Sequence, residues 1–227
     1  VAETLSQRGD KHIIASGITP SGEFHIGHLR EILTGDMITR ACINAGMDAE
    51  FVFIVDSADP LRKVYPFLSK KYEKYIGCPL ATIPAPDANG EPCDSGKSYA
   101  QHFLEPFLNA LEQIDVKPRI IDNYKSYSDG KFSDQSRIAC EDANKIREII
   151  ERVSGRELSA DWFPYNPYGH DGSLDRVKVT GYDWPYVFWE QDGKSGQADL
   201  RKADGKLPWR VDWPAKWSWI GVTCEPF

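Results

Sequence analysis

The feature that most constrains the fold is a unit of three consecutive patterns near the N-terminus. Residues 11–17 (KHIIASG) form a short apolar run that ends in small residues, which is typical of a buried parallel strand. Residues 18–22 (ITPSG) break this pattern, and from Gly27 to Ala41 apolar residues recur at helical spacing. The order strand, loop and amphipathic helix predicts an α/β fold in which the helix packs on a sheet.

Two histidines, in the HIGH sequence of residues 25–28, lie at the start of this helix. The first backbone N–H groups of a helix carry partial positive charge and attract phosphate. Gly22 and Gly27 let a ligand approach the backbone, and His25 and His28 lie on the same side of the first turn. Two imidazoles placed there can stabilise charge on a phosphoryl group during its transfer. The alternatives are an ordinary helix cap or a metal pair, and no third metal ligand lies nearby in the sequence.

Residues 19–28 (TPSGEFHIGH) resemble the HIGH signature of the class I aminoacyl-tRNA synthetases, and they stand in the same strand–loop–helix context. The resemblance implies that His25 and His28 are catalytic and contact the phosphates of ATP, whose oxygens Mg²⁺ would bridge. It implies an ATP site formed by Thr19, Ser21, Gly22, His25, Gly27 and His28. Gly17 and Thr19 would line the pocket for the amino-acid substrate.

A second buried strand is expected at residues 48–56, and its carboxyl end brings Asp56 and Asp59 to the same edge as the first loop. In open α/β sheets ligands bind at that edge. The following residues 60–66 (PLRKVYP) resemble an element of the class I lysyl-tRNA synthetases. Asp56 or Asp59 could therefore hold an ammonium group of the substrate, or serve as a cap for a helix that Pro60 opens.

Hydrophobic spacing predicts further helices at residues 61–76, 99–114 and 133–153, a strand at 118–122, and a loop at 78–96. From about residue 160, aromatic residues alternate with Pro, Gly and Asp, which favours short strands and turns. The chain ends in a strand-like run at residues 221–227.

The aromatic-rich region resembles a metal-binding knuckle of archaeal class I lysyl enzymes, in which cysteines are paired. Residues 167–172 (PYGHDG) and 192–197 (DGKSGQ) contain no thiol. We therefore predict no structural zinc and interpret His170 as a polar loop residue. The five cysteines of the chain are scattered and are interpreted as reduced thiols.

Residues 205–219 (GKLPWRVDWPAKWSW) strongly resemble a second stretch of the class I lysyl-tRNA synthetases. Aromatic faces suit the aliphatic stem and the cation of a lysine substrate. Trp213, Trp217 and Trp219 are therefore candidates for substrate binding. Without the resemblance, such a tryptophan cluster is more often part of a core or of a domain seam.

The resemblance implies a Rossmann-like (HUP-type) parallel-sheet domain with an inserted, aromatic-rich α+β connective subdomain. We expect residues 1–76 to form the first half of the catalytic domain, 77–205 the insertion, and 206–227 the return to the catalytic domain. No KMSKS-like lysine loop occurs in the sequence. We therefore expect a segment of a longer enzyme, without the second half of the catalytic domain and the anticodon-binding domain, that has little activity alone.

The function implied by the resemblance is that of a class I lysyl-tRNA synthetase, which joins lysine and ATP into lysyl-adenylate and transfers the lysyl group to tRNA(Lys). The alternatives are a catalytically silent synthetase-like binding protein and a small-molecule adenylyltransferase. A net charge of −7 argues against strong binding of nucleic acid, unless basic residues gather locally. The sequence has no long apolar run and no signal-peptide pattern, so we expect no membrane association and a cytoplasmic location.

Overall fold

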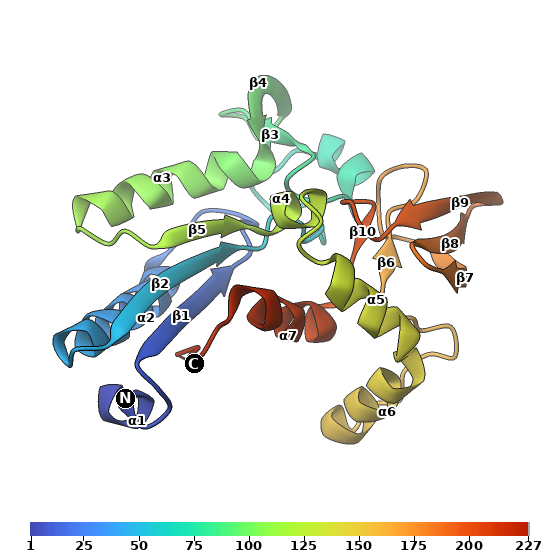
Figure 1. The fold of residues 1–227 in the computed structure, drawn as a ribbon. Helices are drawn as coiled ribbons and strands as arrows, with labels where there is room; N and C mark the ends of the chain where they lie inside the picture. Colours follow the sequence, from blue (N-terminus) through green and yellow to red (C-terminus); the bar gives the residue numbers. More distant parts are fainter. Residues whose placement is uncertain (227) are drawn as a thin grey trace.

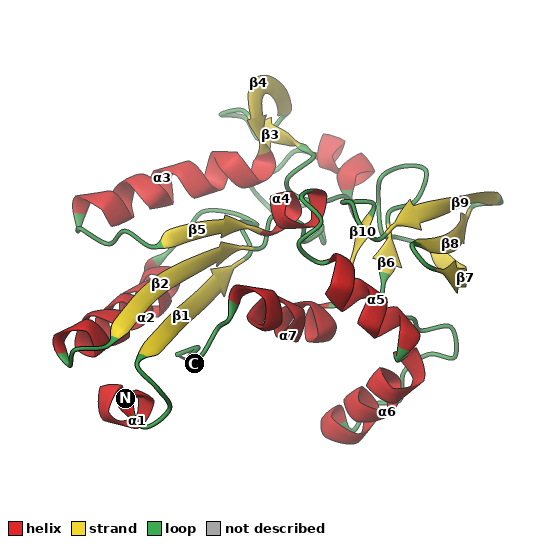
Figure 2. Ribbon diagram, in the orientation of Figure 1, coloured by secondary structure: helices red, strands yellow, loops and turns green. Residues whose placement is uncertain are grey.

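Three parallel strands form the sheet on which the rest of the chain is assembled (Figure 2). The computed structural model describes residues 1–226. The strands β1 (Lys11–Ile18), β2 (Asp48–Val55) and β5 (Arg119–Asp122) lie in the order β1-β2-β5. The predicted α/β fold with a Rossmann-like parallel sheet is confirmed. β5 belongs to this sheet although it lies within the range expected for the insertion.

Helices cover both faces of the sheet, which explains the continuous apolar runs of its strands (Figure 1). Phe51 and Phe53 of β2 pack with α2 (Ile26–Asn44) and α3 (Tyr99–Gln113) on one face. Val52 and Ile54, which alternate with them, pack on the other face with α7 (Trp209–Ile220). A short helix, α1 (Ala2–Ser6), precedes β1.

The close approach of α2 to the sheet depends on a glycine. A Cβ atom at Gly35 would lie 2.4 Å from the ring of Phe51. Glycine at this position therefore lets the helix and the strand meet at a distance that no other residue permits.

The segment between β2 and α3 differs from the prediction. The expected helix at residues 61–76 is wrong apart from a short 3₁₀ helix, η1 (Lys70–Tyr75), because Pro66 lacks an N–H group and disfavours helical geometry in the residue before it. The expected loop at 78–96 contains a hairpin of β3 (Pro84–Pro86) and β4 (Pro92–Ser98). Its prolines concealed it, since proline in a strand is tolerated only at edges and bulges.

The expected helix at residues 133–153 is two helices, α5 (Ser133–Glu141) and α6 (Ala143–Ser154). The backbone leaves helical geometry at Asp142, with φ −98° and ψ 24°. α4 (Asn123–Ser128) follows β5 directly. α6 buries none of its residues and extends away from the sheet (Figure 1).

The aromatic-rich region forms the short strands that its sequence predicts. β7 (Lys178–Asp183), β8 (Tyr186–Gln191) and β9 (Lys194–Asp199) make an antiparallel sheet, and β6 (Asn166–Pro167) pairs with β10 (Gly205–Lys206). Gln191 ties this region together by donating to the Asp171 carboxylate at 3.0 Å and to the Asp175 carbonyl at 2.8 Å. Within residues 1–226, no three His, Cys, Asp or Glu side chains are grouped to hold a metal ion.

The last described residues run beside β1, where Cys224 forms a parallel bridge with Ile14. The expected strand-like run at 221–227 is thus present as a single bridge, and Phe227 lies outside the described residues. None of the helices found in residues 1–226 has the length and apolar character needed to cross a membrane.

Candidate active site

The start of α2 is closed by a reciprocal cap made of two histidines. The backbone N–H of Gly27 donates to His25 Nδ1 at 3.0 Å, and the backbone N–H of His25 donates to His28 Nδ1 at 3.0 Å. The two ring centroids lie 3.9 Å apart. A Cβ atom at Gly27 would lie 2.8 Å from the ring of His25, so a glycine between the histidines is a steric requirement of this cap.

This cap decides which ring nitrogen carries the proton. A neutral imidazole that accepts a hydrogen bond at Nδ1 has its proton at Nε2. His25 and His28 both accept at Nδ1, so each keeps an Nε2–H group available as a donor. Burial, with a further contribution from His25, lowers the pKa of His28 below its ordinary value, which keeps this ring neutral at pH 7.

The backbone at the helix start is less available to a ligand than the sequence argument assumes. The N–H groups of His28 and Leu29 both donate to the His25 carbonyl, at 2.9 and 3.2 Å, while those of His25 and Gly27 serve the cap. The donors that remain for an anion are therefore mainly the two ring N–H groups.

Both histidines line a cavity of about 860 Å³, which lies within the usual range for sites that bind small molecules. Five residues predicted for ATP binding line this histidine cavity together: Thr19, Ser21, Gly22, His25 and His28. Tyr99, at the start of α3, holds the loop by donating to the Ser21 carbonyl at 2.7 Å.

Several residues of this cavity were not predicted, because they come from segments distant in the sequence. The opposite wall is formed by Tyr65, Phe67, Asp87, Gly90, His102 and Phe103. Only the capping box of Ser98 and Gln101, which fixes the start of α3, is a local signal that could have indicated the position of His102. Phe103 lies on the same helix as His102, and the remaining residues belong to the hairpin and to the segment before η1, whose structure the sequence did not reveal.

Five ionisable groups form a buried charge cluster behind the loop of residues 19–25: Asp56, Asp59, Asp212, Lys206 and Lys216. Lys216 binds Asp56 and, at 2.7 Å, Asp212, while Lys206 binds Asp59. Both predicted carboxylates thus hold ammonium groups, but these belong to lysines of the chain itself. The alternative that Asp59 caps a helix is wrong, since no helix begins at Pro60.

Asp59 connects the cluster to the histidine cavity. Thr19 lines that cavity and donates to Asp59 Oδ2 at 2.7 Å, while the other oxygen of Asp59 binds Lys206. Burial alone would raise the pKa of Asp59, but Lys206 and Thr19 lower it overall. The ion pair therefore fixes the first residue of the loop that precedes the histidines.

The cluster as a whole has an excess of negative charge. Three carboxylates face two ammonium groups, and all five side chains are buried. Burial, only partly offset by Lys216, raises the pKa of Asp56. Asn123 adds donors to the same place, 3.2 Å from Asp56 and 3.5 Å from Asp212, and Tyr127 donates to Asp212 at 2.5 Å.

The three candidate tryptophans occupy different environments. Trp213 lies beside the cluster, with its ring 4.3 Å from Lys216 Nζ and so close to Gly17 that a Cβ there would be 2.5 Å from the ring. Trp217 is exposed and lines a groove against α6, which Trp213 also lines. Trp219 packs edge-on against Phe132 in the core. The structure therefore brings only Trp213 and Gly17 to the buried cluster.

Comparison with known proteins shows what the chain is similar to. The family described as tRNA synthetases class I (K) matches residues 1–227. The chain is 44% identical over 221 residues to a lysine–tRNA ligase of Picrophilus torridus, covering 96% of this chain and 42% of that protein. It is 43% identical to the Archaeoglobus fulgidus lysine–tRNA ligase and 41% identical to that of Methanocaldococcus jannaschii, covering 100% of this chain in both cases and 45% and 43% of those proteins. The chain spans less than half the length of these relatives.

Proposed function

This chain belongs to the class I tRNA synthetases (K), and we propose on that premise that it forms the part of a lysine–tRNA ligase that binds ATP and lysine. The observation that carries the proposal is the histidine cap, which leaves two imidazole N–H groups at one cavity. In this proposal His25 and His28 are the catalytic residues, and lysyl-adenylate is the product of the first step.

The proposed first step needs no nucleophile from the protein. A carboxylate oxygen of lysine attacks the α-phosphorus of ATP, and the bond from this phosphorus to the oxygen bridging to the β-phosphate breaks. Pyrophosphate leaves with that electron pair. The Nε2–H groups of His25 and His28 would donate to the phosphate oxygens and stabilise the charge that develops on them. Thr19, Ser21, Gly22 and Gly27 would shape the ATP site, and ATP would enter as its Mg²⁺ complex, with the ion on the phosphate oxygens.

The proposed lysine site uses the excess negative charge of the buried charge cluster. An ammonium group of the substrate would balance the carboxylate that Lys206 and Lys216 leave uncompensated, and Asp56 is the carboxylate whose charge is least stabilised. Trp213, over Gly17, offers an aromatic face for the aliphatic stem. Trp217 and Trp219 are not part of this proposed site, because Trp217 is 42% exposed on the side that faces α6 and Trp219 packs against Phe132.

In the proposed second step the lysyl group passes from the adenylate to the 2′-hydroxyl of the terminal ribose of tRNA(Lys). This step gives the proposal its partner, and the use of tRNA in translation supports a cytoplasmic location.

The experiment is lysine-dependent exchange of pyrophosphate into ATP, measured with and without tRNA. It is run on this chain and on the chain extended over the remaining length of its relatives. His28→Ala should abolish the exchange, while His170→Ala, which changes an exposed histidine that does not line the cavity, should leave it intact.

Exchange that occurs with lysine and is lost in His28→Ala supports the proposal. Absence of exchange with any amino acid in both forms refutes it, and would favour a silent binding protein. Exchange of pyrophosphate that depends on a small acceptor other than an amino acid would favour a small-molecule adenylyltransferase.

A further inference from the structure

The basic residues of this acidic chain are unevenly distributed. Residues 61–75 contain Arg62, Lys63, Lys70, Lys71 and Lys74, with Glu73 as the one acidic residue. No other stretch of this length has so large an excess of basic side chains. The proposed function does not use any of them.

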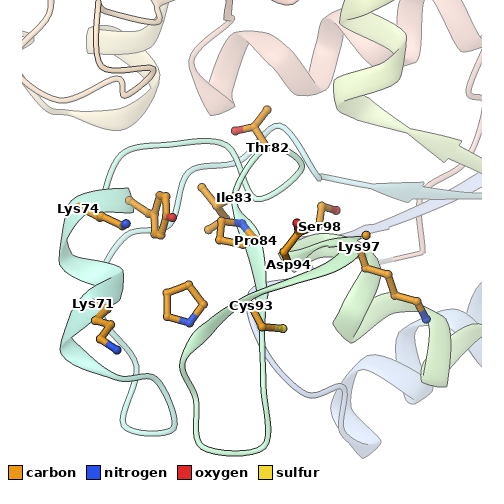
Figure 3. A pocket seen from close by; sticks show the side chains of 12 residues that line it. Lys71, Lys74, Thr82, Ile83, Pro84, Cys93, Asp94, Lys97 and Ser98 are labelled. Atoms are coloured by element: carbon orange, nitrogen blue, oxygen red, sulfur yellow. The ribbon is translucent and has the colours of Figure 1, made fainter.

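Three lysines from two separate segments surround one hollow, which we call the lysine pocket (Figure 3). Lys71 and Lys74 lie on η1, and Lys97 lies near the end of β4, across the hollow from them. The pocket has a volume of about 640 Å³ and is also lined by Cys93, Ser98 and one carboxylate, Asp94. The side chains of Lys71 and Lys97 are 72% and 49% exposed, so both can be reached from solvent.

The present partners of these lysines are exchangeable. Lys71 pairs with Glu91 at 2.7 Å and Lys97 pairs with Glu105, both at the surface. Lys74 lies 4.8 Å from the ring of Tyr75. Exposed ion pairs contribute little to stability, so a polyanion with several phosphates can replace the glutamates without a large loss.

The lysine pocket adjoins the histidine cavity. The two hollows share the β3–β4 hairpin, whose residues 84, 92 and 93 line the lysine pocket while 86–88 and 90 line the histidine cavity. The Gly90 carbonyl accepts from Ser69 N–H at 2.9 Å, which ties the hairpin to the start of η1.

An exposed aromatic side chain, Phe67, precedes η1 in the sequence and lines the histidine cavity. Phe67 is 46% exposed, is stacked with Tyr65 at 5.7 Å with an interplanar angle of 4°, and has its edge contact with Phe103 at 5.6 Å. Phe67 thus presents a supported aromatic surface at the histidine cavity. Basic side chains followed by an exposed aromatic ring are the combination that binds single-stranded nucleic acid.

We propose that the lysine pocket binds backbone phosphates of the unpaired 3′ end of a tRNA, and that a base of this end stacks on Phe67, so that the strand enters the histidine cavity. The inference rests on the proposed function, because it names the path by which the second substrate reaches the site. The phosphate contacts hold the strand without reading its sequence, and the stacked base positions its end.

The test uses this chain and a fluorescent RNA hairpin with the acceptor stem and unpaired 3′ end of tRNA(Lys). Binding is measured by anisotropy over a series of salt concentrations. Lys71→Ala/Lys74→Ala should weaken binding and reduce the slope of log K against log salt by about 1.4, at about 0.7 for each lost contact with single-stranded phosphate. Lys131→Ala/Lys145→Ala removes the same charge from exposed positions on other elements and should leave the slope unchanged.

Phe67→Ala separates stacking from charge. It should lower the affinity for the hairpin by roughly 5- to 150-fold and leave the salt slope unchanged. An RNA hairpin with a blunt end lacks both the stacked base and the phosphates of the unpaired end, so it should bind the original chain more weakly than the unpaired-end hairpin binds Phe67→Ala. Circular dichroism of each variant shows that the fold is retained.

Any of three results would overturn the proposal. These are failure of the RNA hairpin to bind at low salt, equal weakening of binding by the two double lysine variants, and a salt slope that is unaltered in Lys71→Ala/Lys74→Ala. Pyrophosphate exchange, measured on the same lysine and Phe67 variants, distinguishes this failure from failure of the proposed function. Lysine-specific exchange without hairpin binding refutes the lysine pocket alone. Binding of the RNA hairpin through these lysines without any pyrophosphate exchange refutes the synthetase function. It then also refutes the proposal that the bound RNA end is a substrate.

Discussion

The ion pair of Lys206 and Asp59 provides the sharpest test of how the loop before the histidines is held. Lys206→Met keeps the approximate volume of the side chain but removes the ammonium group that pairs with Asp59. Asp59 is only 6% exposed. Asp59 then keeps the hydroxyl of Thr19 as its partner, and the buried charge cluster has three carboxylates facing one ammonium group. Breaking one side of a buried ion pair costs about 3–5 kcal/mol. That is a large part of the stability of a typical domain.

The pH dependence of this loss identifies its cause. In the original protein Lys206 lowers the pKa of Asp59 below 3.8, so the stability that this carboxylate contributes is present above 3.8 and is lost as the pH falls through the lowered pKa. In Lys206→Met, burial without the lysine raises the pKa of Asp59, and the carboxyl takes up a proton at a higher pH. The difference in stability between the two proteins should therefore shrink as the pH falls from 7 to 5.

The assay is urea unfolding at pH 7 and pH 5, with the m-value checked for a change in the unfolded state. Asp59→Asn/Lys206→Met removes both charges and should be more stable at pH 7 than Lys206→Met alone, since replacing both partners leaves no unpaired charge. Lys11→Met breaks the exposed contact with Asp48 and should not alter stability. An equal loss at both pH values, or a double variant no more stable than the single one, would refute the reasoning.

Three further predictions follow from the same contacts. An NMR titration of His28 should give a midpoint below 6.5, because burial and His25 lower its pKa, and a midpoint at or above 6.5 would contradict the cap. Gly17→Ala should raise the KM for lysine more than the KM for ATP in pyrophosphate exchange, because the added Cβ displaces the ring of Trp213; equal changes would remove Trp213 from the proposed lysine site. Tyr127→Phe should lower the free energy of unfolding by about 1–3 kcal/mol, since it removes a buried hydroxyl that donates to the charge cluster and accepts from a backbone N–H, and unchanged urea unfolding would show that these bonds are replaced.

The part of the fold that local patterns encode was predictable. The strand expected at residues 11–17 follows from a short apolar run. The helix after the histidines and the helix expected at 99–114 follow from the period of their apolar residues, and their N-terminal caps are made by residues adjacent in sequence. The same holds for the cavity wall formed by residues 19–28, because a strand, a loop and a helix start are one continuous segment.

Two segments were predicted poorly, one without a regular apolar period and one with a helical period. The hairpin at residues 84–98 gains its structure from packing against the start of α3, where the Tyr99 N–H donates to the Ile83 carbonyl at 2.9 Å. The helix expected at 133–153 is interrupted at Asp142, although the pattern continues through it. For the hairpin, a contact with another element decides the backbone, and the local pattern does not contain it.

By itself the sequence determined the α/β class, the unit that carries the histidines, and the five neighbouring residues that line one side of the cavity. Only the tertiary structure decided which charges meet, because Asp59 and Lys206 are 147 residues apart and Asp56 and Lys216 are 160 residues apart. It also decided that Trp213 lies beside those charges while Trp219 lies in the core. A short-range pattern specifies the face of one element, whereas a buried ion pair or a cavity wall depends on how distant elements pack.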